Sequence, residues 1–347
     1  MDYSDIISDN SPAATDILKR LAQQALWKYS SVFLAQPLEV SKTVLQVHVA
    51  SSKPPRRKEK EDRYAPDERR KQAAYRQDSY DTEGAWGIYK GTNSTYVHSI
   101  LLSTITSFVR SFFSAFFALP DPGLSFTSSS AAAGIAGIVL APLDIARTKL
   151  ILTPSTHPPR SIIATIKTLP TWTLPISLAP TAILHSTLPT FISASTPLFL
   201  RAKLGIDPFV TPNLYAIATF CSQAVELGIK LPVETVLRRG QMGIAQQGVP
   251  KGRALDTVVE VGPYRGLFGT MRSIVYEEGE RGGQAAGDLS KGAKGAAGMK
   301  VGRPGSQKRK GQGVEGLYRG WRVGMWGLIG VWGAATLGGV GGKGGEF

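Results

Sequence analysis

Residues 36–46 read QPLEVSKTVLQ, and two similar stretches follow, APLDIARTKLI at residues 141–151 and LPVETVLRRGQ at residues 231–241. Each has an acid two positions after a proline and a base five or six positions after it. The three prolines lie at positions 37, 142 and 232. A pattern that returns at similar intervals indicates an internal repeat. We therefore predict three repeats.

The residues of this pattern suit a kinked helix. Proline inside a helix removes a backbone hydrogen bond and bends the axis. Charges inside a membrane need partners, so three such helices in a ring could pair the acid of one with the base of the next. The candidate residues are Pro37, Glu39, Lys42, Pro142, Asp144, Arg147, Pro232, Glu234 and Arg238. The alternative is structural: the prolines bend helices, and Glu39–Lys42, Asp144–Arg147 and Glu234–Arg238 are local pairs worth a few tenths of a kcal/mol.

A second motif supports the repeat. The stretch EGAWGIYKG at residues 83–91 and the stretch EGLYRG at residues 315–320 both run from Glu-Gly to aromatic–base–Gly, just before an apolar segment. The candidate turn residues are Gly84, Tyr89, Gly91, Gly316, Tyr318 and Gly320. Residues 264–266 (YRG) look like the start of a matching short helix.

Six apolar segments are long enough to cross a bilayer core, which takes about 20 helical residues. They are Ile17–Val49, Thr92–Leu119, Ser128–Leu152, Thr181–Lys203, Thr211–Gly240 and Gly316–Val340. None is a clean apolar run, so a soluble helical protein remains the alternative. Three stretches, 92–120, 160–206 and 316–345, contain no Asp or Glu. Soluble amphipathic helices normally carry acids on their wet face, so we favour a membrane protein.

The composition excludes some classes of protein. The chain has 347 residues, a formal net charge of +14, 19% charged residues and one cysteine, Cys221, which excludes a disulfide scaffold. Much of the positive charge lies in two stretches, 51–76 and 281–313, which we interpret as solvated basic loops. Neither has the interleaved aromatic residues of a single-strand binder, so we expect no nucleic-acid partner.

Catalytic and metal-binding patterns are missing from the sequence. The four histidines have no ligand spacing, and no Gly-Lys pair completes a phosphate-binding loop. No serine stands in a nucleophile elbow. We therefore expect no enzymatic activity, no metal and no cofactor.

The Pro-acid-base pattern resembles the signature of the mitochondrial carrier superfamily. The resemblance implies an all-α membrane protein: a carrier-like bundle of three two-helix repeats, with about six membrane helices and pseudo-threefold symmetry. Gln46 and Gln241 match the family's glutamine after the base, whereas Ile151 stands there in the second copy. The implied organisation is an acidic tail (1–16), repeat 1 (17–120, with the basic loop 51–82), a divergent repeat 2 (121–206), repeat 3 (207–340, with the Gly/Lys-rich insertion 281–313) and a Gly-rich tail (341–347).

The chain departs from the family pattern in ways that bear on transport. Leu237 stands at the position of the third base, and Arg238 follows one place later, about 100° around the helix. The even-numbered membrane helices contain no acid, so they cannot build the second gate of ion pairs that the family uses. The candidate charges for a solute cavity are Arg110, His185 and Arg322.

Residues 24–37 and 230–239 resemble the carrier-like fusion factors of the fungal mitochondrial outer membrane. This resemblance implies a multi-pass outer-membrane adaptor in mitochondrial fusion that does not transport. It also implies self-association and two protein partners, an outer-membrane fusion GTPase and an inner-membrane dynamin-like GTPase. The alternative is a solute carrier of the mitochondrial inner membrane.

Overall fold

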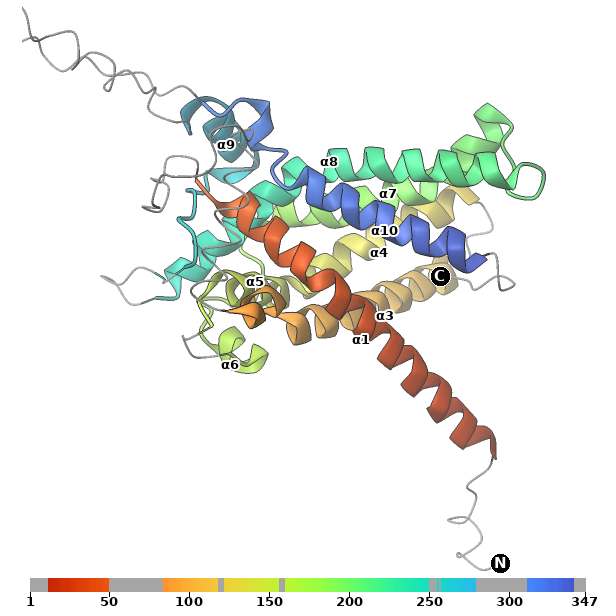
Figure 1. The fold of residues 1–347 in the computed structure, drawn as a ribbon, viewed down its shortest axis with the longest axis horizontal. Helices are drawn as coiled ribbons and strands as arrows, with labels where there is room; N and C mark the ends of the chain where they lie inside the picture. Colours follow the sequence, from red (N-terminus) through yellow and green to blue (C-terminus); the bar gives the residue numbers. More distant parts are fainter. Residues whose placement is uncertain are drawn as a thin grey trace, which may run out of the picture.

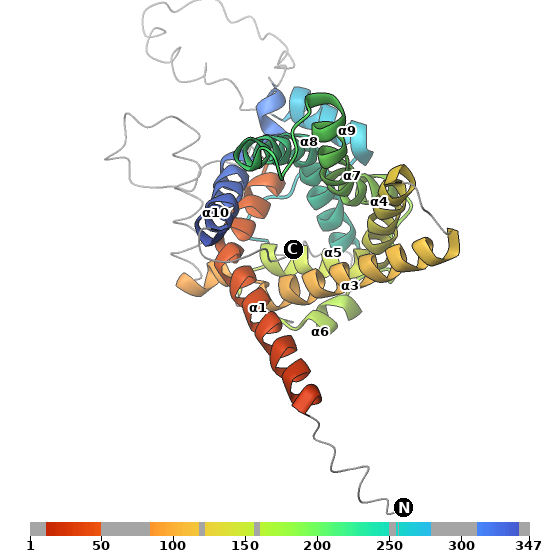
Figure 2. The same cartoon turned by 90° about the vertical axis from the view of Figure 1, so that its right-hand side faces the viewer.

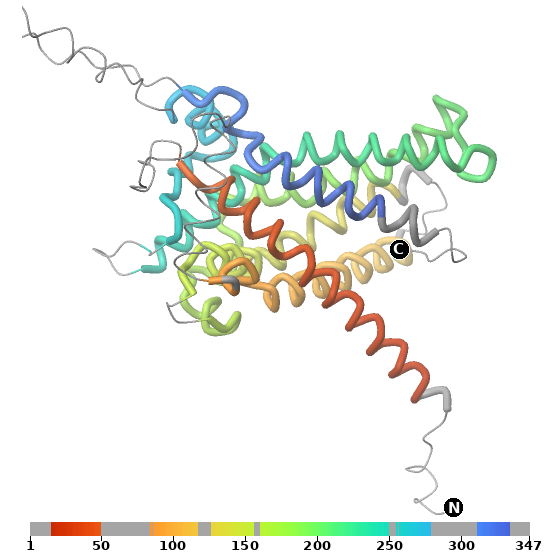
Figure 3. Tube along the Cα trace, in the orientation of Figure 1, coloured from red at the N-terminus to blue at the C-terminus, as the bar shows by residue number. Residues whose placement is uncertain are grey.

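The computed structural model describes residues 12–49, 84–117, 122–155, 160–249, 255, 257–278 and 311–339. Figure 3 traces the chain and draws the residues whose placement is uncertain in grey. Several predicted segments lie outside these residues. They are most of the acidic tail 1–16, the basic loop 51–82, nearly all of the insertion 281–313 and the Gly-rich tail 341–347.

Helices dominate the part of the chain that the structure describes. Within it the one β contact is an isolated antiparallel bridge between His48 and Val261, so the all-α prediction is confirmed. The longer helices are α1 (Pro12–Val47), α3 (Thr92–Phe117), α4 (Pro122–Val139), α5 (Ala141–Leu152), α7 (Ala179–Leu204), α8 (Pro212–Gln247) and α10 (Trp321–Gly339). The short elements are η1 (Ala85–Tyr89), α6 (Ile162–Lys167), α9 (Gly266–Arg272), the π-helical turn η2 (Ser273–Glu277) and η3 (Val314–Gly316).

The long helices surround a common axis. Seen end-on, α1, α3, α4, α7, α8 and α10 follow one another around the centre in chain order (Figure 2). The short elements and α5 gather at one end of this bundle (Figure 1). The first half of α1 leaves the bundle, and its apolar side chains Ile17, Leu18 and Leu21 are more than half exposed.

The three repeated prolines occupy two kinds of position in their helices. Pro37 and Pro232 lie inside the continuous helices α1 and α8. Pro142 instead lies in the first turn of α5, where its missing N–H costs no helical hydrogen bond, and α4 and α5 meet there at 61°. The predicted apolar segment Ser128–Leu152 is therefore bent, and the structure divides it at Leu140 into two helices.

Apolar character alone marks few of these helices as membrane spans. Among the described residues, the stretch Trp86–Phe116 is long and apolar enough to cross a membrane, and the bent pair Phe126–Val139 and Ala141–Leu152 could form one more span. The other described helices do not combine the length and the apolar character of a membrane span. The number of six spans, the three-repeat carrier bundle and its pseudo-threefold symmetry remain predictions.

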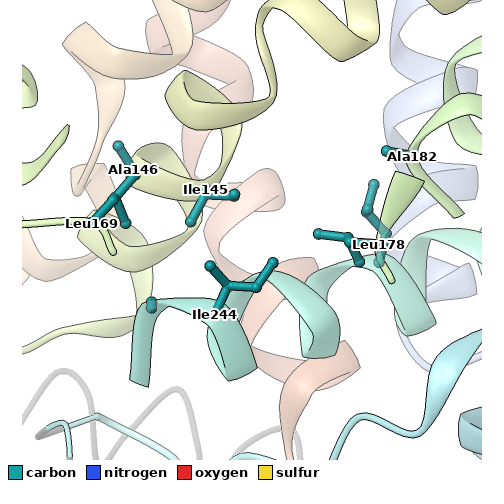
Figure 4. Close-up of a cluster of buried hydrophobic side chains, with 8 residues drawn as sticks. Ile145, Ala146, Leu169, Leu178, Ala182 and Ile244 are labelled. Carbon is teal, nitrogen blue, oxygen red and sulfur yellow. The ribbon is translucent and has the colours of Figure 1, made fainter. Parts of the chain in front are cut away.

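The apolar core lies at the end where the short elements gather. One cluster joins Ile145 and Ala146 of α5, Leu178 and Ala182 at the start of α7, and Ile244 of α8 (Figure 4). A second cluster joins α1, α5, α8 and the segment after α8, and its members are Val40, Val44, Val47, Ile151, Leu152, Met242 and Val259. The core therefore fixes the relative positions of the three Pro-acid-base stretches.

We predict that Gly240→Ala destabilises the fold. A methyl group there would overlap the Leu178 side chain and come within 3.0 Å of the Tyr264 ring. Overpacking of this kind costs about 1–3 kcal/mol, so thermal unfolding in detergent should occur at a lower temperature.

Gly228→Ala in the same helix is the matched control. No described heavy atom lies within 4 Å of its added methyl group, so the change should be neutral or stabilise the helix by up to about 1 kcal/mol. Equal unfolding temperatures for the two variants would contradict the described packing of α7 and Tyr264 against α8.

Candidate functional site

The three Pro-acid-base stretches meet at one end of the bundle and join their charges in a circle. We call Glu39, Lys42, Asp144, Arg147, Glu234 and Arg238 the charge ring. Arg147 Nη2 of α5 lies 2.6 Å from Glu39 Oε1 of α1. Lys42 Nζ of α1 lies 2.8 Å from Glu234 Oε1 of α8.

Arg238 completes the circle although it stands one position late in the sequence. Its Nη1 lies 3.0 Å from Asp144 Oδ1, and its Nη2 lies 3.7 Å from Glu39 Oε1. The long guanidinium side chain compensates for the rotation around the helix. Arg238 therefore pairs across to α5 and α1, and the local Glu234–Arg238 pair considered from the sequence gives way to these contacts.

The local pairs also form in the other two stretches. Lys42 Nζ lies 3.2 Å from Glu39 Oε2, and Arg147 Nη1 lies 3.6 Å from Asp144 Oδ1. In these two stretches the base therefore bridges its own helix and the neighbouring one.

Gln241 braces the ring on its α8 side. Its amide Nε2 donates to Asp144 Oδ2 at 2.5 Å, and its Oε1 accepts from Arg238 Nη1 at 3.0 Å and from Thr148 at 2.6 Å. Gln46 occupies the matching position on α1, but neither atom of its amide has a hydrogen-bond partner among the described residues. The two glutamines of the predicted signature therefore play different parts.

Burial makes the ring sensitive to the loss of one partner. The side chains of Glu234 and Arg238 are only 2% and 4% exposed. A buried ion pair adds little net stability because both ions lose their hydration, but removal of one partner strands the other charge at a cost of about 3–5 kcal/mol. The ring therefore adds little net stability. Its main effect is to disfavour other arrangements of α1, α5 and α8, which would leave buried charges unpaired.

The predicted turn residues lie in or beside the short elements η1 and η3. Gly84 precedes η1 and Gly316 ends η3, while Gly91 and Gly320 have φ of 74° and 84°, a region that favours glycine. A Cβ at Gly320 would also lie only 3.0 Å from Cγ of Lys42, so the lysine side chain would have to shift. Tyr89 stacks on Phe33 of α1 with ring centroids 4.4 Å apart, and the Tyr318 N–H bonds within the η3 turn.

In two of the aromatic–base–Gly motifs, 89–91 and 318–320, the base reaches the end of a Pro-acid-base helix elsewhere in the chain. Lys90 Nζ donates to the Thr153 carbonyl just after α5 at 3.5 Å, and Arg319 Nη1 donates to the His48 carbonyl just after α1 at 2.8 Å. Bases favour helix C-termini, where carbonyls lack partners and the dipole is negative. Lys90 after η1 thus caps the C-terminal end of α5, and Arg319 after η3 caps the C-terminal end of α1.

A central cavity of about 910 Å³ lies between α3, α4, α7, α8 and α10. It is on the side of the charge ring away from the C-terminal ends of α1 and α5. Its charged lining residues are Arg110, Glu226 and Lys230, and Gln223, Thr190 and Ser193 add polar groups. A smaller cavity of about 240 Å³ lies against the ring and is lined by His98, His185, Asp144, Arg147 and Arg238 among others.

Two of the three predicted cavity residues line these spaces. Arg110 lines the central cavity and His185 lines the smaller one, where its Nε2 has no hydrogen-bond partner among the described residues. Arg322 lines neither; its exposed guanidinium lies 5.7 Å from the centre of the Trp321 ring. Sequence reasoning missed Glu226, Lys230 and His98, although the polar residues that recur along 211–241 indicate one wet face of α8.

The arrangement is suited to holding helices together and to binding a polar solute. The described histidines, cysteine and carboxylates form no group of three that could hold a metal ion. Charges of both signs face the central cavity, so its chemistry matches an anionic or zwitterionic ligand.

Comparison with known proteins gives a distant likeness. No protein-family model matches the chain. It is 25% identical over 226 residues to the mitochondrial fusion and transport protein UGO1 of Saccharomyces cerevisiae. The match covers 56% of this chain and 45% of the yeast protein, so the chain spans less than half the length of this relative. Membership of the carrier superfamily remains a prediction.

We predict that Lys42→Met lowers the stability of the fold by about 3–5 kcal/mol, because the buried Glu234 carboxylate then loses the cation 2.8 Å away. Thermal or chemical unfolding of the purified protein measures the change. Lys28→Met in the same helix is the control, since Lys28 donates to the Ser103 hydroxyl and its loss should cost no more than about 0.5 kcal/mol. Equal costs for the two variants would contradict the ring.

Proposed function

We propose that this protein is a multi-pass adaptor of the mitochondrial outer membrane that is required for mitochondrial fusion and does not transport solutes. The observation that carries the role in fusion is the likeness to the yeast mitochondrial fusion and transport protein. Because the similarity covers only part of each chain, we assign the role in fusion to this protein as a proposal.

The distribution of charge supports the absence of transport. All three acids of the ring lie at one end of the bundle, on α1, α5 and α8. The ranges of α3, α7 and α10 contain no Asp or Glu. A transporter with two gates must close the far end of the bundle when the ring opens. Without an acid, α3, α7 and α10 cannot form ion pairs with one another to close that end.

The proposed setting is a lipid bilayer, with α1, α3, the bent pair α4–α5, α7, α8 and α10 as the six membrane elements. The proposed protein partners are an outer-membrane fusion GTPase, an inner-membrane dynamin-like GTPase and a second copy of the chain. No enzymatic step or cofactor enters this proposal. Recovery of both GTPases and of a differently tagged copy with the purified protein would support these partners.

The decisive test of the role is content mixing. In cells that lack the protein, mitochondria carrying two matrix fluorophores should fail to mix them, and the full chain should restore mixing. In parallel, the protein in liposomes should exchange no nucleotide, carboxylate or amino acid. Normal mixing without the protein would refute the role in fusion, and robust exchange would refute the non-transporting part.

The location has its own test. Residues 51–76 contain ten Lys or Arg, so trypsin should cut there readily. Cleavage in intact mitochondria would support the outer membrane with this stretch facing the cytosol. Protection until the inner membrane is opened would contradict it and favour an inner-membrane carrier.

The central cavity favours a second candidate, a solute carrier of the inner membrane. Arg110 on α3 and Lys230 and Glu226 on α8 all line its wall, which gives charges of both signs for a polar solute. Under this candidate the open cavity is the binding site and the ring is its closed gate.

This candidate predicts that Arg110→Ala and Lys230→Ala abolish liposome uptake, because both remove a cation from the cavity wall. Arg322→Ala is the matched control and should leave uptake unchanged, since its guanidinium stacks on Trp321 and lines neither cavity. Uptake that survives both cavity substitutions would remove the reason for the second candidate.

A further inference from the structure

A short segment between α8 and α9 crosses the ring end of the bundle. Residues 257–262 read TVVEVG, and we call this segment the latch. It lies on the side of the charge ring that faces away from the central cavity, beside the C-terminal ends of α1 and α5.

The latch bonds to two of the three Pro-acid-base helices. The Val258 N–H donates to the Leu152 carbonyl at the end of α5 at 2.9 Å. The Val49 N–H after α1 donates to the Glu260 carbonyl at 3.2 Å, and the Gly262 N–H donates to the Val47 carbonyl at 3.4 Å. Orphan carbonyls at the ends of two helices thus find partners in one strap.

The latch also contacts α8, the third of these helices. A Cβ at Gly262 would come within 2.8 Å of the Arg239 guanidinium carbon, so the backbone lies directly against this group. Arg239 is fully buried, holds both oxygens of Glu278 at 2.7 Å, and donates to the His48 carbonyl at 3.3 Å. One buried guanidinium therefore joins α8, the end of α1 and the chain beyond the latch.

Apolar packing closes the space between these helices. Val259 is 6% exposed and lies among the valines of α1, Ile151 and Leu152 of α5, and Met242 of α8. The ring end therefore has two layers, the ion pairs and then an apolar plug under a hydrogen-bonded strap. None of the latch contacts uses a charge of the ring.

We propose that the latch holds the ring end of the bundle closed independently of the ion pairs. The inference deepens the proposed function and rests on it, since an end that stays shut is incompatible with a transport cycle that opens each end in turn. It gives that scaffold a physical lock: opening would require breaking strap hydrogen bonds and exposing Val259 as well as separating the ring.

Hydrogen exchange of the purified full chain in detergent tests this proposal. Val259→Ala removes two methyl groups from the plug, so the amides of Val49, Val258 and Gly262 should exchange about tenfold faster, because each buried methylene contributes about 0.8 kcal/mol. Amides of α7 report that the fold is intact. Glu260→Gln is the control, since its exposed side chain makes none of these contacts.

Asp144→Asn separates the two layers. It weakens the ring at Arg238 and should leave the three latch amides protected as in the unchanged protein. The proposal is overturned if Val259→Ala leaves their exchange unchanged, or if Asp144→Asn accelerates it as much as Val259→Ala does. The measurement needs no fusion partner, so a negative content-mixing result would refute the proposed function and leave this result standing.

Discussion

The architecture depends on three acid–base pairs that join helices far apart in the chain. Glu39 with Arg147, Asp144 with Arg238, and Glu234 with Lys42 form a closed circle in which each acid meets the base of another stretch. Because these charges are largely buried, any other arrangement of the three helices would strand ions at a high cost. The apolar clusters, the capping bases and the latch contact the same three helices through groups outside the ring.

Much of this architecture could be predicted from the sequence. The long helices follow from the long apolar segments, and the convergence of charges follows from the repeated Pro-acid-base spacing. The choice of partner for Arg238 could not be predicted, since Glu234 lies one turn away on the same helix and Asp144 becomes available only through tertiary packing. Lys230 and Glu226 were missed because composition does not say which face of α8 points inward. The latch is too short to show a periodic pattern. Its role depends on contacts with residues that lie far from it in the sequence.

The asymmetry of the bundle links structure to function. One end has a charge ring, an apolar plug and a strap, while the central cavity lies toward the other end, where α3, α7 and α10 supply no carboxylate. The ring end is thus closed by several kinds of contact, whereas the far end has no ion pairs that could close it. This difference favours the proposed adaptor in fusion over a transporter, which must open each end in turn.

The most direct test of the ring is a double-mutant cycle between Asp144 and Arg238, the pair whose base is out of register. Stability is measured for Asp144→Asn, Arg238→Gln and the double variant. If the two side chains pair as described, the double variant loses less than the sum of the single losses, with a coupling energy of about 1 kcal/mol or more. If the loss of the double variant equals the sum of the two single losses to within about 0.5 kcal/mol, the residues do not interact, and the closed ring is contradicted.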